Sequence, residues 1–167
     1  AGQRCTACSR VIVQRGVHRE LLARLVARTE KLRLGDGLLP TTDVGPIINR
    51  RALEGIHAYT TIGQAEGARL AVGGRIAAEG ELARGHFYAP TIFDGVRPDM
   101  RLAQEEIFGP VLSVIEVADL AEAVAVNNAT PYGLSSALFT TNVNAAFAAI
   151  RDLTTGIVYI NAGTIGA

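Results

Sequence analysis

Apolar residues recur along this chain in two patterns, as short β-branched runs and as longer stretches with helical spacing. The short runs predict strands, because β-branched and aliphatic side chains pack well on a sheet that is covered on both faces. Pro90 lies inside one run and places that strand at a sheet edge, since proline cannot donate a ladder hydrogen bond. The predicted strands cover residues 11–13, 69–72, 88–93, 111–117, 135–139 and 157–160.

Helical spacing of leucine, valine and alanine predicts four helices between these strands. We expect Gly35 to stop the first helix, and Asn49 and Asp119 to be the N-caps of the second and third. Either Asn142 or Asn144 caps the fourth. The predicted helices cover residues 17–34, 50–64, 120–128 and from 143 or 145 to 153, with loops at 41–49 and, more exposed, at 75–86.

Strands that alternate with helices indicate βαβ units. We therefore expect an α/β fold with a mostly parallel sheet covered by helices on both faces. The 167 residues fit one domain with a hydrophobic core, and no repeat or linker divides them. Both ends of the chain look truncated, so we expect residues 1–167 to be one incomplete domain of a longer protein.

Composition and charge exclude several classes of function for this chain. The 16 basic and 16 acidic residues give zero formal net charge, which excludes the basic surface typical of nucleic-acid and anionic-membrane binders. No apolar run approaches the roughly 18 residues of a membrane span. Two cysteines are too few for a disulfide framework, and this predicts a reducing, cytoplasmic location.

Cys5 is the first candidate for chemistry. Small residues follow it and leave room for a substrate to approach the sulfur, and a helix beginning there would stabilise a thiolate with its N–H groups. The alternative is a buried, unreactive thiol.

Cys8 completes a C-x-x-C pair with Cys5. The pair could be a redox dithiol or a stress-formed disulfide, or Cys8 could be a small core residue one helical turn from Cys5. We favour the core residue. No second C-x-x-C and no metal-like histidine spacing are present, so we expect no metal.

The segment 104–111 is the second candidate, with two acids, an aromatic residue and a Gly-Pro turn before a buried strand. A carboxylate there could accept hydrogen bonds from two sugar hydroxyls, and Phe108 could pack on a planar ring. The alternative is a solvated acidic turn with Phe108 in the core. Asn161 follows the last strand, where open α/β sheets place their sites, or it caps a loop.

Five motifs in order resemble the aldehyde dehydrogenase family along essentially the whole chain. They are GQRCTA at 2–7, GDG with TDVGPII within 35–48, EEIFGPV at 105–111, NN with YGLS within 127–135, and GIVYIN at 156–161. The resemblance implies the family's catalytic-domain fold and NAD- or NADP-dependent oxidation of an aldehyde to a carboxylic acid.

The resemblance also implies a role for each matching residue. Cys5 would be the nucleophile that forms a thiohemiacetal and then a thioester, and its backbone N–H would belong to the oxyanion hole. Glu106 would hold the nicotinamide ribose hydroxyls, and Phe108 would pack near the nicotinamide. Asn161 would help order the active-site loop, and Gly163 and Thr164 would line the substrate end of the site.

Other parts that the family uses have no counterpart in these residues. The general-base glutamate, the oxyanion side-chain amide and the cofactor-binding domain would lie upstream, and the oligomerisation strand downstream. We therefore expect this chain alone to be inactive, and the full-length enzyme to be a homodimer or homotetramer. Residues 160–167 are similar to members acting on 2-oxoglutarate semialdehyde, with succinate semialdehyde or a range of aliphatic aldehydes as alternatives.

Three other functions stay open. A C-x-x-C redox domain would form a reversible Cys5–Cys8 disulfide. A non-catalytic interaction module would have a tight partner and an inert Cys5. An acyl-thioester-forming reductase would share the same fold.

Overall fold

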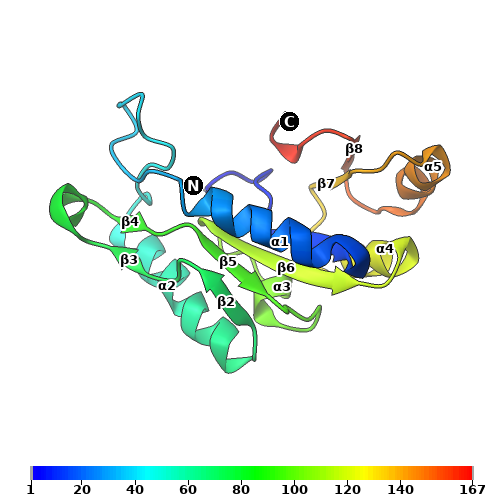
Figure 1. The fold of residues 1–167 in the computed structure, drawn as a ribbon, viewed down its shortest axis with the longest axis horizontal. Coiled ribbons are helices and arrows are strands. Elements are labelled where there is room, and N and C mark those ends of the chain that lie inside the picture. Colours follow the sequence, from blue (N-terminus) through cyan, green and yellow to red (C-terminus); the bar gives the residue numbers. More distant parts are fainter. Residues whose placement is uncertain (1, 167) are drawn as a thin grey trace.

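The computed structural model describes residues 2–166 and contains a four-stranded central sheet (Figure 1). Its strands, in spatial order, are β1 (Arg10–Gln14), β6 (Val111–Val117), β5 (Thr91–Asp94) and β2 (Arg69–Val72). β1, β6 and β5 run parallel, whereas β2 pairs antiparallel with β5. The prediction of an α/β fold with a mostly parallel sheet is confirmed.

One face of this sheet is covered by α1 (Arg15–Thr29). Leu22 of this helix belongs to a buried cluster with Val13 of β1, Ile92 of β5 and Val114 of β6. These strand residues share a face because side chains alternate between the two sides of a strand.

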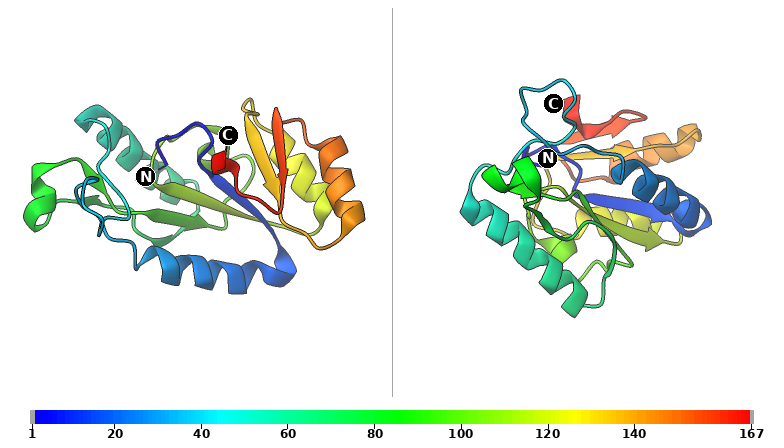
Figure 2. Two further views of the ribbon diagram at one scale, coloured as in Figure 1. Left: turned by 90° about the horizontal axis from the view of Figure 1, so that it is seen from above. Right: turned by 60° about the vertical axis from the view of Figure 1, so that its left-hand side comes forward.

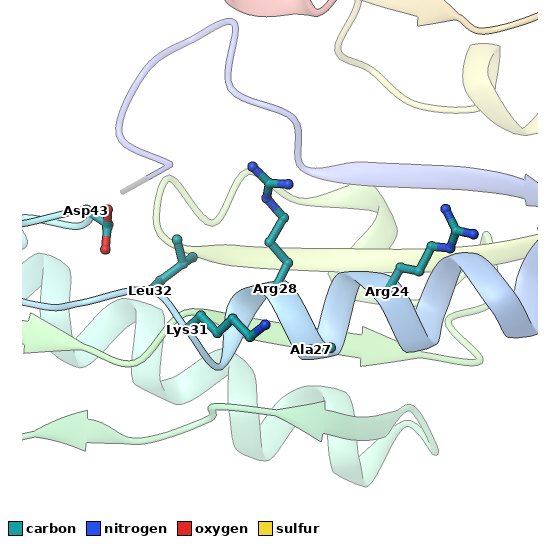
Figure 3. A pocket seen from close by; sticks show the side chains of 6 residues that line it. All are labelled: Arg24, Ala27, Arg28, Lys31, Leu32 and Asp43. Atoms are coloured by element: carbon teal, nitrogen blue, oxygen red, sulfur yellow. The ribbon is translucent and has the colours of Figure 1, made fainter.

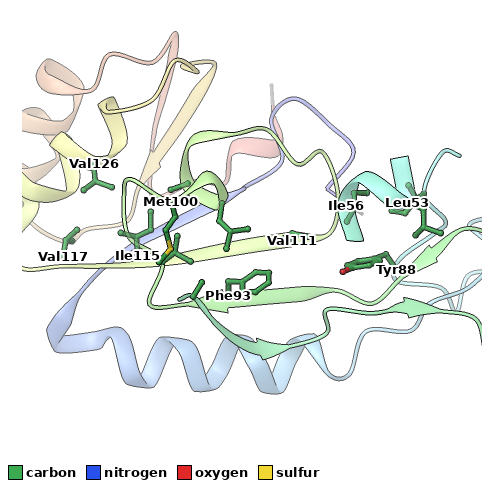
Figure 4. Close-up of a cluster of buried hydrophobic side chains, with 14 residues drawn as sticks. Leu53, Ile56, Tyr88, Phe93, Met100, Val111, Ile115, Val117 and Val126 are labelled. Carbon is green, nitrogen blue, oxygen red and sulfur yellow. The ribbon is translucent and has the colours of Figure 1, made fainter. Parts of the chain in front are cut away.

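The larger core lies on the opposite face (Figure 4). Phe93 and Ile115 each follow a residue of the first cluster and therefore point the other way. They form one buried cluster with Ile56, Leu102 and Val126, which come from three helices. The helices on this face are α2 (Arg50–Ala65), α3 (Arg101–Gln104) and α4 (Leu120–Asn128).

Two smaller sheets of two strands each flank the central one. The first is antiparallel with a 3-10 turn between its strands, and the second is parallel with a helix between them. They consist of β3 (Ile76–Ala77), η1 (Gly80–Arg84) and β4 (Phe87–Tyr88), and of β7 (Ser135–Leu138), α5 (Val143–Asp152) and β8 (Ile157–Ile160). A 3-10 turn, η2 (Thr164–Gly166), follows β8.

The segment around Pro90 differs from the prediction of one edge strand over 88–93. The structure has two strands there, β4 and β5, and Pro90 lies between them. β5 is an interior strand, flanked by β6 and β2, because its ladder begins at Thr91 and leaves the proline outside. The prediction of a loop over 75–86 is also wrong in part, since β3 and η1 form within it.

The predicted N-caps are confirmed, whereas Gly35 does not stop the first helix, whose C-cap is Glu30. The side chains of Asn49 and Asp119 accept hydrogen bonds from backbone N–H groups in the first turns of α2 and α4. At α5, Asn142 is the cap and Asn144 is one of its two donors.

The first helix is shorter than the predicted range 17–34, because the segment that follows it forms contacts with the loop at 43–44. It ends at Thr29, and Arg33 then forms an ion pair with Asp43 at 2.9 Å between nitrogen and oxygen. Leu34 forms a β-bridge with Val44. Within residues 2–166, no helix combines the length and apolar character that a bilayer crossing requires.

Candidate active site

Cys5 lies in a tight turn just before β1. The Ala7 N–H donates a hydrogen bond to the Arg4 carbonyl oxygen at 3.0 Å, which places Cys5 and Thr6 at the centre of the turn. The helix expected to begin at Cys5 is not formed, because the Ser9 carbonyl already accepts a hydrogen bond from β6 and draws the chain into the sheet. Stabilisation of a thiolate by a helix N-terminus is therefore absent at this turn.

A cavity of about 740 Å³ opens beside this turn, walled by β1, α1, β7 and the segment 102–111. Four of the predicted site residues line it: Cys5, Glu106, Phe108 and Thr164. Asn161 and Gly163 are not among the residues that line it. Cys5 is itself exposed, so its sulfur is accessible from this cavity.

Distant parts of the chain meet at the Cys5 turn, where Figure 2 shows the last segment of the chain, in red, close to the first, in dark blue. The Thr164 hydroxyl donates a hydrogen bond to the Thr6 carbonyl oxygen at 2.7 Å. Gly2 lies against Gly109, and a Cβ at Gly2 would lie only 1.9 Å from the Gly109 carbonyl oxygen. Since Gly2 also has a φ of +70°, only glycine fits this close approach.

Cys8 is not the core residue that the sequence suggested. It is exposed and lines the same cavity as Cys5, because the turn replaces the helix that would have pointed it inward. Its thiol donates a hydrogen bond to the Arg10 carbonyl oxygen at 3.4 Å. The chain around the sulfur desolvates it, and this raises the pKa of the Cys8 thiol. Cys8 therefore favours the protonated, less nucleophilic form.

The two neighbouring acids have different surroundings. Glu105 accepts hydrogen bonds from Arg101 at 2.8 Å and from the Tyr59 hydroxyl at 2.7 Å, and these bonds lower the pKa of its carboxyl. Glu106 is exposed, and no side chain of residues 2–166 forms a hydrogen bond or ion pair with it. Glu105 thus joins α2 to α3, while Glu106 is free to accept hydrogen bonds from a ligand.

Phe108 turns away from the core. Its backbone φ of 54° lies in the left-handed region, where a non-glycine residue costs on the order of 1–3 kcal/mol. Its neighbour Ile107 packs against the larger core, whereas Phe108 is 46% exposed and lines the cavity. The alternative that Phe108 is a core residue is therefore wrong.

Asn161 caps a loop. Its side-chain oxygen accepts a hydrogen bond from the Thr140 N–H at 2.8 Å, and its Nδ2 donates to the Thr140 carbonyl oxygen at 2.9 Å. The residue has a φ of 56°, and its amide joins the end of β8 to the segment after β7. An ordering effect on the site stays a prediction, as does a substrate contact for the exposed Gly163.

Tyr132 is a further lining residue that the sequence did not indicate as part of the site. This side chain is 53% exposed and lines the cavity. The available signal was an aromatic residue between Pro131 and Gly133, at the start of the YGLS motif.

A second hollow, of about 630 Å³, lies beside α1 (Figure 3). Arg24, Arg28, Lys31 and Asp43 are its charged lining residues, and it holds no cysteine and none of the predicted site residues. Among residues 2–166, no group of three or more His, Cys, Asp and Glu side chains is placed to hold a metal ion. The cavity at Cys5 is therefore the candidate active site.

The sequence matches known enzymes along its whole length. The model of the aldehyde dehydrogenase family matches residues 1–167. An alpha-ketoglutaric semialdehyde dehydrogenase from Bacillus subtilis (strain 168) is 39% identical over 165 residues, which are 99% of this chain and 34% of the relative. An alpha-ketoglutarate semialdehyde dehydrogenase from Haloferax volcanii is 42% identical over 165 residues, with the same coverage.

Solved structures agree with this match. A betaine aldehyde dehydrogenase variant from Staphylococcus aureus, in complex with NAD+ and with a BME-modified cysteine, has a TM-score of 0.95 at 36% identity. The alignment covers 98% of this chain and 33% of that one. The chain thus spans about a third of the length of the relatives it matches. Fold, motifs and family match together show that this chain belongs to the aldehyde dehydrogenase family.

Proposed function

We propose that this chain is the nucleophile-bearing part of a longer NAD(P)-dependent aldehyde dehydrogenase, which oxidises an aldehyde to a carboxylic acid. The observation that carries the proposal is that Cys5, near the start of the chain, lines one cavity with Glu106 and Phe108, which are far from it in the sequence. Family membership and the NAD+ complex of the Staphylococcus aureus relative support it.

Cys5 is the nucleophile in this proposal. Its thiolate sulfur forms a bond to the aldehyde carbon, the carbonyl π electrons move to the oxygen, and a thiohemiacetal results. The backbone N–H of Cys5 donates a hydrogen bond to that oxygen, and one such donor contributes about 3–4 kcal/mol to transition-state stabilisation. Bound NAD(P) supplies the hydride acceptor for the oxidation. Loss of hydride leaves a thioester on Cys5, and water attack on its carbonyl carbon releases the carboxylic acid and the free thiol.

The cavity residues fit the nicotinamide end of the cofactor. A carboxylate only accepts hydrogen bonds, so the unpaired carboxylate of Glu106 suits the two hydroxyls of the nicotinamide ribose. Phe108 presents an aromatic side chain to the same cavity and suits packing near the planar nicotinamide ring.

We infer that the substrate of the longer enzyme is 2-oxoglutarate semialdehyde. Two relatives at 39% and 42% identity carry that activity in their names, and residues 160–167 resemble such members, although Ala167 lies outside the described residues. A betaine aldehyde dehydrogenase from Brucella anthropi is 40% identical over 161 residues, so identity alone does not separate an anionic from a cationic substrate. Succinate semialdehyde and aliphatic aldehydes remain the alternatives.

The test is an assay of the full-length protein with NAD+ or NADP+, following the absorbance of the reduced cofactor. We expect turnover of 2-oxoglutarate semialdehyde, a loss of about 10⁴-fold or more in Cys5→Ala, and near-normal rates in the matched Cys8→Ala. The 167 residues alone should show no useful turnover. A higher kcat/KM for betaine aldehyde would contradict the substrate, and turnover in Cys5→Ala would contradict the mechanism.

A further inference from the structure

The side chain of Gln3, two residues before Cys5, is held by a distant loop. Its Nε2 donates a hydrogen bond to the Pro46 carbonyl oxygen at 3.1 Å, and its Oε1 accepts one from the Ile48 N–H at 2.9 Å. Both ends of one amide therefore bind the backbone of the same loop. Only an amide side chain presents a donor and an acceptor side by side in this way at neutral pH.

The loop that receives Gln3 is itself firmly fixed. Ile47, between the two residues that bind the amide, is 2% exposed and belongs to the larger core. Its N–H donates a hydrogen bond to the His86 carbonyl oxygen at 2.7 Å. The cap residue Asn49 follows directly and starts α2. A contact with this loop is thus a contact with the rigid core, and no catalytic role is otherwise assigned to it.

The turn is also held on the far side of Cys5. Thr6 is 5% exposed, and its carbonyl oxygen accepts the hydrogen bond from Thr164. The Thr6 hydroxyl is buried and has no hydrogen-bond partner among the described residues, so the turn keeps this position despite an unsatisfied polar atom. Cys5 therefore lies between two fixed points, Gln3 and Thr6.

We infer that Gln3 is a positioning residue for the nucleophile. The inference rests on the proposed function of Cys5. By joining the turn to the loop at 46–48, the Gln3 amide holds the Cys5 thiol and backbone N–H where sulfur can add to an aldehyde carbon while N–H meets the developing oxyanion. Small errors in such geometry are costly, since misplacement by about 1 Å can reduce the rate roughly 100-fold.

The experiment compares Gln3→Met and Gln3→Glu with the control Gln64→Met, an exposed position on α2, in the full-length protein. We expect kcat of Gln3→Met to fall roughly 10- to 100-fold with KM within about twofold of the wild-type value, and no change in Gln64→Met. A neutral glutamic acid has both a donor and an acceptor, whereas its carboxylate has no donor. The ratio of kcat for Gln3→Glu to that of the wild type should therefore rise as pH falls, which general loosening of the fold would not produce.

Hydrogen exchange provides a readout that needs no dehydrogenase activity. In Gln3→Met the turn N–H of Ala7 should exchange faster than in the wild type, while peptides from α2 and β6 exchange at the same rate and the unfolding temperature is unchanged. Unchanged exchange at the turn, wild-type kcat in Gln3→Met, or a kcat loss that appears only with a lower unfolding temperature would each overturn the inference. If the wild type oxidises no aldehyde, the proposed function fails, and the exchange measurement still decides whether Gln3 holds the turn.

Discussion

Cys5 and Cys8 are separated by three positions in the sequence and line one cavity, but their surroundings differ. Both residues are exposed, but the surrounding chain desolvates the Cys8 sulfur, which donates to a backbone carbonyl, whereas Cys5 lies at the centre of a turn. Glu105 and Glu106 differ in the same sense, because only the first is bound by neighbouring side chains. In the proposed function, the member of each pair that acts on substrate or cofactor is the one whose side chain has no partner among the described residues.

This difference predicts selective labelling of the two thiols. A short pulse of iodoacetamide near neutral pH should alkylate Cys5 several-fold faster than Cys8, because the chain around the Cys8 sulfur desolvates it, which raises the pKa of the thiol and lowers its thiolate fraction. Peptide mass spectrometry measures both sites in one sample, and Cys8 labelling should increase when the pH is raised. Faster labelling at Cys8 would contradict the assignment, and a reversible Cys5–Cys8 disulfide in a redox titration would support the dithiol alternative.

At the scale of elements, a network of polar side chains joins α1 to the sheet. His18 of α1 lies with Nε2 2.6 Å from a carboxylate oxygen of Asp94 in β5, and with Nδ1 3.2 Å from Glu116 in β6. Arg69 of β2 binds the second oxygen of Asp94 at 2.5 Å. Burial alone would raise the pKa of the Asp94 carboxyl, but hydrogen bonds from His18 and Arg69 outweigh it and lower the pKa.

The lowered pKa of Asp94 predicts how stability depends on acid. A carboxyl whose pKa is lower in the folded state stabilises that state above its unfolded pKa of about 3.9, and this contribution is lost as the pH falls through the folded value. Urea unfolding of the chain should therefore show a steep loss of stability below about pH 4, and a shallower loss in Asp94→Asn. The exposed Asp99→Asn is the matched control and should follow the wild type. Identical acid profiles for wild type and Asp94→Asn would refute this role.

At the scale of the whole molecule, the second half carries an unpartnered apolar face. Val143, Phe147 and Ile150 of α5 are 64%, 68% and 55% exposed, and their spacing places them on one side of the helix. From residue 133 to 165 the only charged side chains are Arg151 and Asp152. Exposed apolar surface with so little charge favours association.

We therefore expect the isolated 167-residue chain to self-associate. Size-exclusion chromatography with light scattering should give a mass above that of the monomer, and a triple variant with serine at Val143, Phe147 and Ile150 should shift it toward the monomer. Serine at Leu38, Leu39 and Ile48, which are exposed but lie outside α5, is the matched control. A purely monomeric wild-type chain would contradict the prediction that the exposed face of α5 causes self-association.

Predictions from the local sequence pattern are correct where neighbouring residues determine the secondary structure. The caps Asn49 and Asp119 and the apolar runs of β1 and β6 lie as expected, because capping and strand formation depend on neighbouring residues. The helix at Cys5 and the edge strand at Pro90 fail, because hydrogen bonds to remote segments override the local preference.

The sequence by itself determined most of the longer strands and helices, the family, and the identity of the candidate nucleophile, since periodicity and contiguous motifs encode these, whereas β3, η1, α3 and the division at Pro90 were not predicted. Only the tertiary structure decided which glutamate is free, that Cys8 lies on the cavity, and that Gln3 binds the loop at 46–48. These properties depend on contacts between residues far apart in the chain, and the packing of α1, β6 and the two chain segments at the Cys5 turn creates those contacts.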